Sequence, residues 1–311
     1  MIFEDISKIA SIPIEERVDY IGDKRKRAYD KDRFRSNMML NPLNLKHLNS
    51  IDSSSADMIT LNLEDAIAPS RKREALYNIA LFLSHLEDSQ SFIIIRTNPI
   101  NEGGDREIAF LNDFAFDAIR IPKVVDSSDI SKALSLLSDD KELHISLETA
   151  QAFQNLSQLR IDERLTTANL GILDLLTSLG LSQDIVKIGN PTIDYILSKF
   201  LVDAKSIGIR PISFMFQKYS DIDGFKEWCK REKMMGFETK ACMGPAQVKV
   251  VHEIFASTYE ELQRARDIKE LFETNSAKGI NGFMDSRYGF IDEPIYRDAL
   301  LVLENKRGRY E

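Results

Sequence analysis

The fold is decided by residues 57–96, which read DMITLNLEDAIAPSRKREALYNIALFLSHLEDSQSFIIIR. Two short apolar runs, Asp57–Leu63 and Ser91–Arg96, flank a longer segment, Ser70–Leu86, whose apolar residues recur at helical spacing. Parallel strands need a long crossover between them, and a helix usually supplies it. The stretch therefore predicts one strand–helix–strand unit of a parallel sheet.

The same alternation continues along most of the chain. The expected strands are Asn37–Leu40, Asp57–Leu63, Ser91–Arg96, Phe116–Ile121, Leu143–Glu148, Asn169–Asp174, Arg210–Phe214 and Gly236–Ala241. The expected helices include Ser70–Leu86, Ser127–Leu137, Asp184–Ile207 and Asp221–Met235, the last with Asp221 as its N-cap. Eight strands, each followed by a helix, predict a (β/α)8 TIM barrel rather than an open doubly wound sheet. Neither a dinucleotide-binding G-x-G-x-x-G nor a P-loop sequence is present, which excludes those classes.

The barrel is expected over residues 35–257, with a segment on either side. Residues 1–34 read as an N-terminal helix followed by a charged arm. Residues 258–311 read as a C-terminal helical extension, with a helix at Tyr259–Thr274, a loop at Ser276–Gly289 and a final helix after Asp292, and another helix, Pro245–Phe255, precedes this extension. This extension is longer than a barrel needs, so we expect it to cover a face of the barrel or a neighbouring subunit.

Composition narrows the functional class. The 311 residues are 43% hydrophobic and 29% charged, which is typical of a globular protein with a sizeable core. The two cysteines fit no metal or disulfide pattern, and no signal peptide or 18-residue apolar stretch is found, so we expect a cytoplasmic protein that is not membrane-spanning. A net charge of −8 disfavours general nucleic-acid binding, although Asp23–Arg35 holds seven basic residues against three acidic ones.

Chemistry in such a barrel lies at the C-terminal ends of the strands, and here those positions are polar or charged. They are Glu64 and Asp65 after the second expected strand, Arg96, Thr97 and Asn98 after the third, Lys123 after the fourth, Glu148 after the fifth and Asp174 at the end of the sixth. Glu148 and Asp174 would form an oxygen-rich pair of the kind that Mg²⁺ prefers, with Mn²⁺ as the alternative ion. The other interpretation is that each acid caps the helix that follows.

A guanidinium at the mouth of a barrel is costly unless it meets carboxylates or an anionic ligand. Arg96 therefore predicts either an ion pair with Glu64 or Asp65, or an anion-binding site, and the residues alone leave both open. The four histidines have no sequence partner for catalysis and are interpreted as structural or surface residues. Cys242 is interpreted as a buried apolar residue.

An ordered set of motifs makes the chain recognisable. The motifs are Arg35-Ser-Asn-Met-Met-Leu-Asn-Pro, Leu63-Glu-Asp-Ala-Ile-Ala-Pro, Ile95-Arg-Thr-Asn, Arg120-Ile-Pro-Lys, Leu147-Glu-Thr, Leu170-Gly-Ile-Leu-Asp-Leu, Gly236-Phe-Glu-Thr-Lys-Ala-Cys-Met-Gly-Pro and Gly289-Phe-Ile-Asp-Glu-Pro. In this order they resemble the HpcH/HpaI aldolase and citrate lyase β-subunit family over about residues 35–305.

The resemblance implies a (β/α)8 barrel that makes or breaks a carbon–carbon bond next to a thioester, using Mg²⁺. It implies Glu148 and Asp174 as metal ligands, Arg96 as the arginine that faces the reacting oxygens, and Glu64 with Asp65 as an acidic pair that holds the site together. Asp292 matches an acid–base carboxylate that reaches a neighbouring subunit, usually within a trimer, and the other interpretation of Asp292 is an N-cap of the final helix. Asn98 and Lys123 are predicted to bind substrate together with Arg96.

The preferred hypothesis is a lyase that cleaves a 3-hydroxyacyl thioester of the citryl-CoA type to an acetyl thioester and a 2-oxo acid. The acyl group of this thioester is carried by CoA or by an acyl carrier. The resemblance also implies partner subunits of a citrate lyase complex. The alternatives are a malyl-CoA or citramalyl-CoA lyase, a malate-synthase-like enzyme, and a non-catalytic thioester-binding subunit. The last is suggested by Leu173 and Gly244, which stand where the family has polar residues. A further departure from the family pattern is Leu43, where the loop usually has a small residue.

Overall fold

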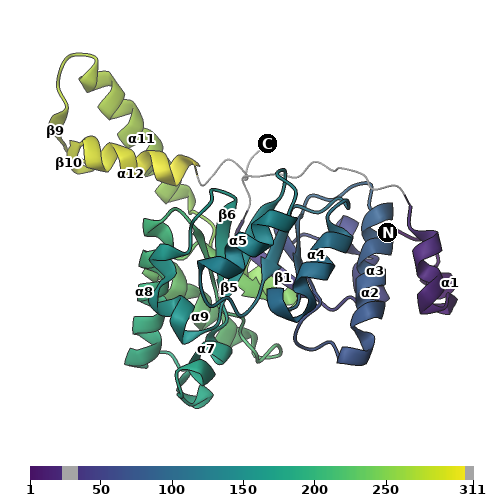
Figure 1. Ribbon diagram of the computed structural model, residues 1–311. Helices are drawn as coiled ribbons and strands as arrows, with labels where there is room; N and C mark the ends of the chain where they lie inside the picture. Colours follow the sequence, from purple (N-terminus) through teal and green to yellow (C-terminus); the bar gives the residue numbers. More distant parts are fainter. Residues whose placement is uncertain (23–33, 305–311) are drawn as a thin grey trace. The chain divides into compact units, whose positions relative to one another are not determined.

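The computed structural model describes residues 1–22 and 34–304, and its centre is a closed barrel of eight parallel strands that pair in chain order (Figure 1). The strands are β1 (Ser36–Leu40), β2 (Met58–Asn62), β3 (Phe92–Arg96), β4 (Ala118–Ile121), β5 (Glu142–Leu147), β6 (Leu165–Leu170), β7 (Arg210–Ser213) and β8 (Thr239–Cys242). The barrel closes where β8 pairs with β1, with Lys240 opposite Ser36. The predicted (β/α)8 fold is confirmed.

Helices between the strands form the outer layer (Figure 1). They are α2 (Leu45–Leu48), α3 (Lys72–His85), α4 (Asp105–Leu111), α5 (Ser127–Leu136), α6 (Ala150–Gln154), α7 (Ile172–Ser178), α8 (Pro191–Ser206), α9 (Ile222–Met235) and α10 (Pro245–Ile254). Asp221 caps α9 as predicted, because its Oδ1 accepts from the Gly224 N–H at 2.9 Å. The helix expected from Asp184 begins only at Pro191, since proline favours the first helical position and Asn190 caps it.

The sixth strand was wrongly placed by its sequence pattern. The apolar run after Asn169 suggested a strand ending at Asp174, but β6 ends at Leu170 and Asp174 lies in the first turn of α7. The true strand was missed because its inward positions, Thr167 and Asn169, are polar although buried. An apolar run is therefore a poor guide to a strand whose inner face lines a polar barrel interior.

Alternation along the strands divides the interior of the barrel by depth. A small apolar cluster fills one end of the interior and is formed by Met58, Phe92, Ile94, Ala118, Ile212 and Ala241. On β3 the side chains of Phe92, Ile94 and Arg96 share the inner face, because strand side chains alternate. The inner face thus changes from apolar to charged toward the C-terminal end of β3, where the site lies.

A buried carboxylate ties the first two strands to the last helix of the barrel. Asp57 Oδ2 accepts from the Arg35 backbone N–H at 2.8 Å and lies 3.2 Å from Arg35 Nε and 3.3 Å from His252 Nε2 on α10. The same ring nitrogen lies 2.9 Å from Ser36 Oγ. His252 is therefore structural, as predicted, and helps to hold the closure of the barrel.

The chain divides into two compact units, with a boundary between Phe255 and Ala256. The barrel unit also contains α1 (Ile6–Ser11) and the short 3-10 helix η1 (Ile14–Tyr20), while the predicted charged arm, Lys24–Arg27, lies outside the described residues. The second unit contains α11 (Tyr259–Ser276), the hairpin strands β9 (Gly282–Asp285) and β10 (Gly289–Asp292), and α12 (Glu293–Glu304). The expected loop over Ser276–Gly289 thus contains a strand. Within the described residues, no helix is long and apolar enough to span a membrane.

Replacement of Asp57 by Asn should reduce the dependence of stability on acid pH. Burial alone would raise the pKa of Asp57, but His252 and Arg35 outweigh it and lower the pKa to about 2, from 3.8 in the unfolded chain. A lowered pKa gives stability that is present above about pH 4 and lost as the pH falls toward 2, about 2 kcal/mol in total. Urea unfolding at several pH values should show this loss in the wild type and much less of it in Asp57→Asn. The exposed Asp223→Asn is the control and should behave as the wild type does.

Candidate functional site

The centre of the site is Arg96, the last residue of β3. Its Nη2 lies 2.7 Å from Glu64 Oε2 and 2.9 Å from Glu148 Oε1, and 3.9 Å from Asp65 Oδ2. Arg96, Glu64 and Glu148 are all buried, with 7%, 2% and 5% of their surface exposed. The ion pair with Glu64 expected from the sequence is therefore present, and Glu148, which follows β5, is a second partner.

The loop after β2 is held in a strained conformation. Asn62 donates through Nδ2 to the Asp65 backbone oxygen and accepts at Oδ1 from the Glu64 N–H at 3.3 Å. The Asp65 N–H donates to Glu64 Oε2 at 2.7 Å. Ala66 follows with φ of 70°, in the left-handed region that costs a residue with a Cβ about 1 kcal/mol or more. These local bonds place Glu64 under Arg96 and leave Asp65 more exposed.

Lys123 follows β4 and joins the same carboxylates from the other side. Its Nζ lies 2.8 Å from Glu64 Oε1 and 3.5 Å from Asp65 Oδ1, while its backbone N–H donates to Glu148 Oε2 at 3.1 Å. Lys123 also has a positive φ, 51°, and among the described residues it shares this feature only with Ala66 outside glycine. Strain confined to two loops at one mouth indicates a functional site there.

Glycine is required at position 171 by the close approach of Glu148. A Cβ built on Gly171 would lie 2.2 Å from Glu148 Cγ and 2.7 Å from Glu148 Oε1. The chain turns from β6 into α7 at this glycine, so the start of α7 lies directly against the carboxylate. The glycine in the motif Leu170-Gly-Ile-Leu-Asp-Leu therefore has a steric role in the site.

Glu148 and Asp174 are close enough to interact electrostatically. Burial is the main factor that raises the pKa of Glu148; Arg96 opposes it, and the negative charges of Glu64 and Asp174 raise it further. Asp174 is exposed in the first turn of α7 rather than at the end of a strand. Asp174 thus acts electrostatically on Glu148 from a helix, and the role of the two carboxylates as a metal site stays a prediction.

The donor set fits a hard divalent cation. Among the residues that the structure describes, no group of three or more His, Cys, Asp or Glu side chains is arranged to hold a metal ion, and the candidate donors are the two carboxylates of Glu148 and Asp174. Mg²⁺ keeps several waters and is commonly bound by one or two carboxylates plus substrate oxygens. A cation beside Glu148 and Asp174 would also relieve the repulsion that raises the pKa of Glu148. Glu148 and Asp174 could therefore hold Mg²⁺.

The two acids after β2, Glu64 and Asp65, have pKa values that are shifted in opposite directions. Burial would raise the pKa of Glu64, but Arg96 and Lys123 outweigh it and lower that pKa. The pKa of Asp65 is raised by burial and by the neighbouring Glu64 carboxylate. Glu64 is thus held as the negative partner of the two cations.

Asn98, predicted to bind substrate, is buried and bonded within the protein. Its backbone N–H donates to Glu107 Oε2 at 2.7 Å, its Nδ2 donates to Glu107 Oε1 and lies 3.4 Å from the Leu63 oxygen, and its Oδ1 accepts from Lys72 Nζ. These bonds hold the loops after β2 and β3 together. A direct role for Asn98 in substrate binding stays a prediction.

Asp292 belongs to the second unit, at the end of β10. Its Oδ1 accepts from the Ile295 N–H at 3.3 Å, so it caps the first turn of α12. The capping role that the sequence offered as the plain alternative is therefore present. An acid–base role for Asp292 stays a prediction.

A second arginine in the barrel had no role assigned to it from the sequence. Arg120 lies on the inner face of β4, and its Nη1 donates to Asn169 Oδ1 at 2.9 Å. Asn169 also accepts from Asn37 Nδ2 at 3.1 Å, and Asn37 Oδ1 accepts from Thr60 Oγ1 at 2.8 Å. An arginine between two isoleucines of a buried strand was a signal that the sequence contained.

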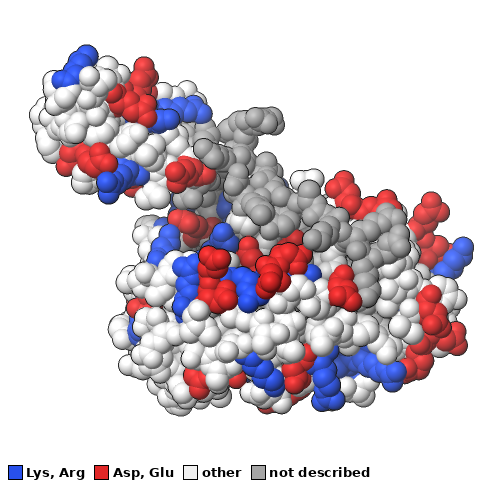
Figure 2. Space-filling view, turned by 45° about the horizontal axis from the view of Figure 1, so that its top comes forward, with Lys and Arg blue, Asp and Glu red and all other residues white. Residues whose placement is uncertain are grey.

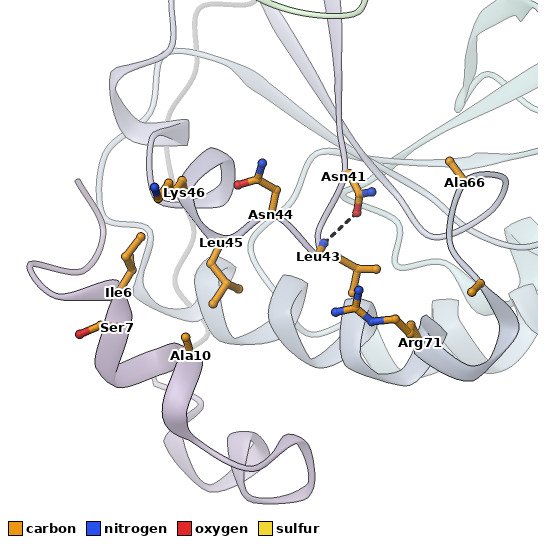
Figure 3. Close-up of a pocket in the computed structure, with 11 residues that line it drawn as sticks. Ile6, Ser7, Ala10, Asn41, Leu43, Asn44, Leu45, Lys46, Ala66 and Arg71 are labelled. Carbon is orange, nitrogen blue, oxygen red and sulfur yellow. Dashed lines mark hydrogen bonds between the residues drawn. The ribbon is translucent and has the colours of Figure 1, made fainter.

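A cavity of about 730 Å³ lies beside the loops after β1 and β2 (Figure 3). It is lined by Ile6, Ser7, Ala10, Asn41, Leu43, Asn44, Leu45, Lys46, Ala66, Ala68 and Arg71. Ala66 is part of the strained loop that carries Glu64, so the cavity adjoins the site. Lys46 and Arg71 supply positive charge at its wall, and α1 contributes Ile6 and Ala10 (Figure 3).

On the face of the molecule in Figure 2, acidic and basic side chains are interspersed.

Comparison with known proteins gives a family from the sequence and the same fold from the structure. Residues 35–245 match the model of the HpcH/HpaI aldolase/citrate lyase family. A (3S)-malyl-CoA thioesterase of Cereibacter sphaeroides is 26% identical over 81% of this chain and 87% of its own. A citrate lyase subunit beta of Haemophilus influenzae is 24% identical over 81% of this chain and 89% of its own. The crystal structure of CitE from Mycobacterium tuberculosis, in complex with magnesium, acetoacetate and coenzyme A, superimposes with a TM-score of 0.70 at 18% identity, over 88% of this chain and 98% of that one.

Replacement of Gly171 by Ala should destabilise the protein mainly through Glu148. The new Cβ would overlap the Glu148 side chain, and overpacking of this kind costs about 1–3 kcal/mol. Urea unfolding of a double-mutant cycle with Glu148→Ala measures the coupling, because the second change removes the overlapping atoms. Gly171→Ala should then cost clearly less in the Glu148→Ala background. An equal cost in both backgrounds would show that Glu148 is not what requires the glycine.

Proposed function

Because the chain belongs to the HpcH/HpaI aldolase/citrate lyase family, we propose that it is an Mg²⁺-dependent carbon–carbon lyase that cleaves a 3-hydroxyacyl-CoA of the citryl-CoA type. The observation that carries the proposal is the buried Arg96, held between Glu64 and Glu148, with Asp174 close enough to raise the pKa of Glu148. The matched relatives include proteins named for citrate lyase and for malyl-CoA, which supports a CoA thioester as the class of substrate.

We assign Glu148 and Asp174 as the residues that would hold Mg²⁺. The bound ion would polarise the carbonyl oxygen of a 2-oxo acid as a Lewis acid. Glu148 is already oriented for this by Arg96 and by the Lys123 backbone N–H, so little reorganisation is needed.

The chain's own residues can supply the remaining steps. Cleavage would break the bond between C2 and C3 of the hydroxyacyl group. The hydroxyl proton would pass to the Asp292 carboxylate, the C3–O group would become the carbonyl of the oxo acid, and the electron pair of the broken bond would stay on C2 as the thioester enolate. Arg96 would stabilise the negative charge on the reacting oxygens in a site that is largely shielded from water. Asp292 would then give a proton to C2, which leaves an acetyl thioester.

The cavity beside the site is the proposed place of the thioester arm. It adjoins Ala66, and Lys46 and Arg71 at its wall suit a phosphate-bearing ligand. Its apolar lining by Leu43 and Leu45 suits an uncharged chain that leads from the phosphates to the barrel mouth. Leu43 is itself a departure from the family pattern, which usually has a small residue at this position.

Two other activities of the same site remain as outcomes of the test. Cleavage of malyl-CoA or citramalyl-CoA would keep the residues and change the oxo acid that is released. The relative named as a malyl-CoA thioesterase adds hydrolysis of the thioester without cleavage of the carbon chain. A non-catalytic thioester-binding subunit would bind CoA and turn over none of these compounds.

We further propose that the second unit brings Asp292 to the barrel of another copy in a homo-oligomer, most simply a trimer. Met284 and Phe290 are paired across the β9–β10 hairpin, and 75% and 56% of their surfaces are exposed within one chain. Large apolar side chains at such a place suit a protein interface.

The purified protein should release a keto acid from one of citryl-CoA, malyl-CoA and citramalyl-CoA, and should do so only with Mg²⁺. Glu148→Gln and Asp174→Asn keep the shape of each side chain and remove its charge, so each should lower kcat/KM by at least about a hundredfold. A coupled assay for oxaloacetate, glyoxylate and pyruvate measures the rate, and Asp184→Asn, on a surface turn, is the control. Unchanged cleavage in both site variants would contradict the proposed function.

Inactive Asp292→Asn and Glu148→Gln variants should regain part of their activity when they are mixed and allowed to exchange subunits. A neighbouring pair in the mixed oligomer can combine an intact Glu148 from one chain with an intact Asp292 from the other. The rate of cleavage before and after exchange is the measurement, with light scattering to follow the oligomeric state. Exchange without any recovery would place Asp292 in the site of its own chain or outside the site.

A further inference from the structure

Arg120 is a second buried cation directly beside the site. It lies opposite Arg96 in the pairing of β3 with β4 and opposite His144 in the pairing of β4 with β5, and it faces the barrel interior. Like charges on neighbouring strands repel each other and destabilise the sheet. Arg96 is balanced by Glu64 and Glu148, whereas no ion pair between Arg120 and a carboxylate is found in the part of the chain that the structure describes. The positive charge of Arg120 is thus left without a direct counter-ion.

The hydrogen bonds around Arg120 contain more donors than acceptors. Its Nη1 shares Asn169 Oδ1 with Asn37 Nδ2, so the amide oxygen of Asn169 is already used twice. Arg120 Nε and Asn169 Nδ2 are buried donors for which the described residues supply no acceptor, and the same holds for Arg96 Nε. Each buried donor without an acceptor costs about 1–3 kcal/mol. An acceptor atom supplied by a ligand would remove this cost.

Two residues of the interior near Arg120 keep a little exposed surface. Asn169 on β6 and Ala241 on β8 keep 7% and 8% of their surface exposed, although both face the interior. The next inward positions toward the apolar end, Thr167 and Ile94, are fully buried. Arg120 and Asn169 lie where the interior changes from apolar to polar, and this pair is called the floor of the site.

We propose that Arg120 and Asn169 bind a second carboxylate of the oxo-acid portion of the substrate, below the carboxylate and carbonyl that face Arg96, Glu148 and Asp174. This inference rests on the proposed function and narrows its substrate to one that releases a dicarboxylic 2-oxo acid. A monocarboxylic oxo acid would leave the charge and the donors at the floor without a partner. Discrimination by buried polar groups that are left unpaired is the strongest form of selectivity that a site can have.

The electrostatics agree with this assignment. Burial and the neighbouring Arg96 lower the pKa of Arg120 to about 9, so the guanidinium keeps its charge at neutral pH while the site disfavours that charge. A bound carboxylate would reverse this effect and would gain a charge-assisted hydrogen bond.

Oxaloacetate and pyruvate test the inference, because they differ by one carboxylate. Their dissociation constants are measured by calorimetry on the full chain with MgCl₂, with freshly dissolved oxaloacetate. The wild type should bind oxaloacetate at least about tenfold more tightly than pyruvate, and Arg120→Met should bring the ratio close to one while the affinity for pyruvate changes by less than about twofold. Arg17→Met is the matched control, because Arg17 is equally buried and also donates to an amide oxygen, that of Asn78.

A second variant keeps the inference testable if Arg120→Met does not fold. Asn169→Ala removes the uncompensated Nδ2 donor and keeps the charge of Arg120, and it should lower the ratio about threefold to tenfold. The inference is overturned if the wild type does not prefer oxaloacetate. It is overturned equally if the folded variants keep the wild-type ratio, or if they lose both ligands by the same factor.

The result of this binding experiment is independent of the result of the test of the proposed function. Preference for oxaloacetate that depends on Arg120 in a protein that cleaves no thioester would support the floor site and reject the lyase. Cleavage of a thioester by a protein whose oxaloacetate binding ignores Arg120 would support the lyase and reject the floor site.

Discussion

The Arg96 guanidinium lies between two buried carboxylates, and the arrangement of the site depends on this contact. Glu64 and Glu148 come from the ends of β2 and β5, on either side of β3 and β4, so the shared cation holds four strands in one arrangement. Removal of the cation would leave two buried negative charges close together, which is far more costly than the loss of an exposed ion pair. The strained backbone at Ala66 and Lys123 is explained in the same way, because both loops must bring their groups to these carboxylates.

Around Glu148, burial and the neighbouring negative charges outweigh the nearby cations, so the pKa of Glu148 is raised. Glu148 is buried, accepts from Arg96 and Lys123, and still has a raised pKa because burial dominates and Glu64 and Asp174 lie near. A site of this kind is prepared for a divalent cation, since the cation would add the positive charge that is missing. Preorganised charge of this type contributes to catalysis because it does not have to be rearranged during the reaction.

The change in character along the barrel interior sets the depth of the site. One end is filled by Phe92, Ile94 and their apolar neighbours and is closed to water. Toward the C-terminal ends the interior becomes polar, with Asn37, Asn169, Arg120 and Arg96. A ligand bound at those ends would meet these polar groups as its deepest partners.

Local sequence patterns were sufficient to predict much of the fold and about half of the site. Seven of the eight strands were placed within a few residues, since their apolar runs and the helical spacing between them are local patterns. The same reasoning placed Glu64, Arg96, Lys123 and Glu148 correctly at strand ends. It failed for β6, where buried Thr167 and Asn169 hid the strand and Asp174 was taken for its end.

The sequence by itself determined the repeated alternation of strand and helix and the charge at the strand ends, because spacing along the chain is sufficient for both. Only the tertiary structure decided that Arg96 takes Glu148 as a partner, 52 positions away, and that Arg120 is buried beside it against Asn169, 49 positions away. Which charges are neutralised and which stay uncompensated depends on closure of the barrel. That closure brings distant strand ends within hydrogen-bonding distance, and no local pattern in the sequence records it.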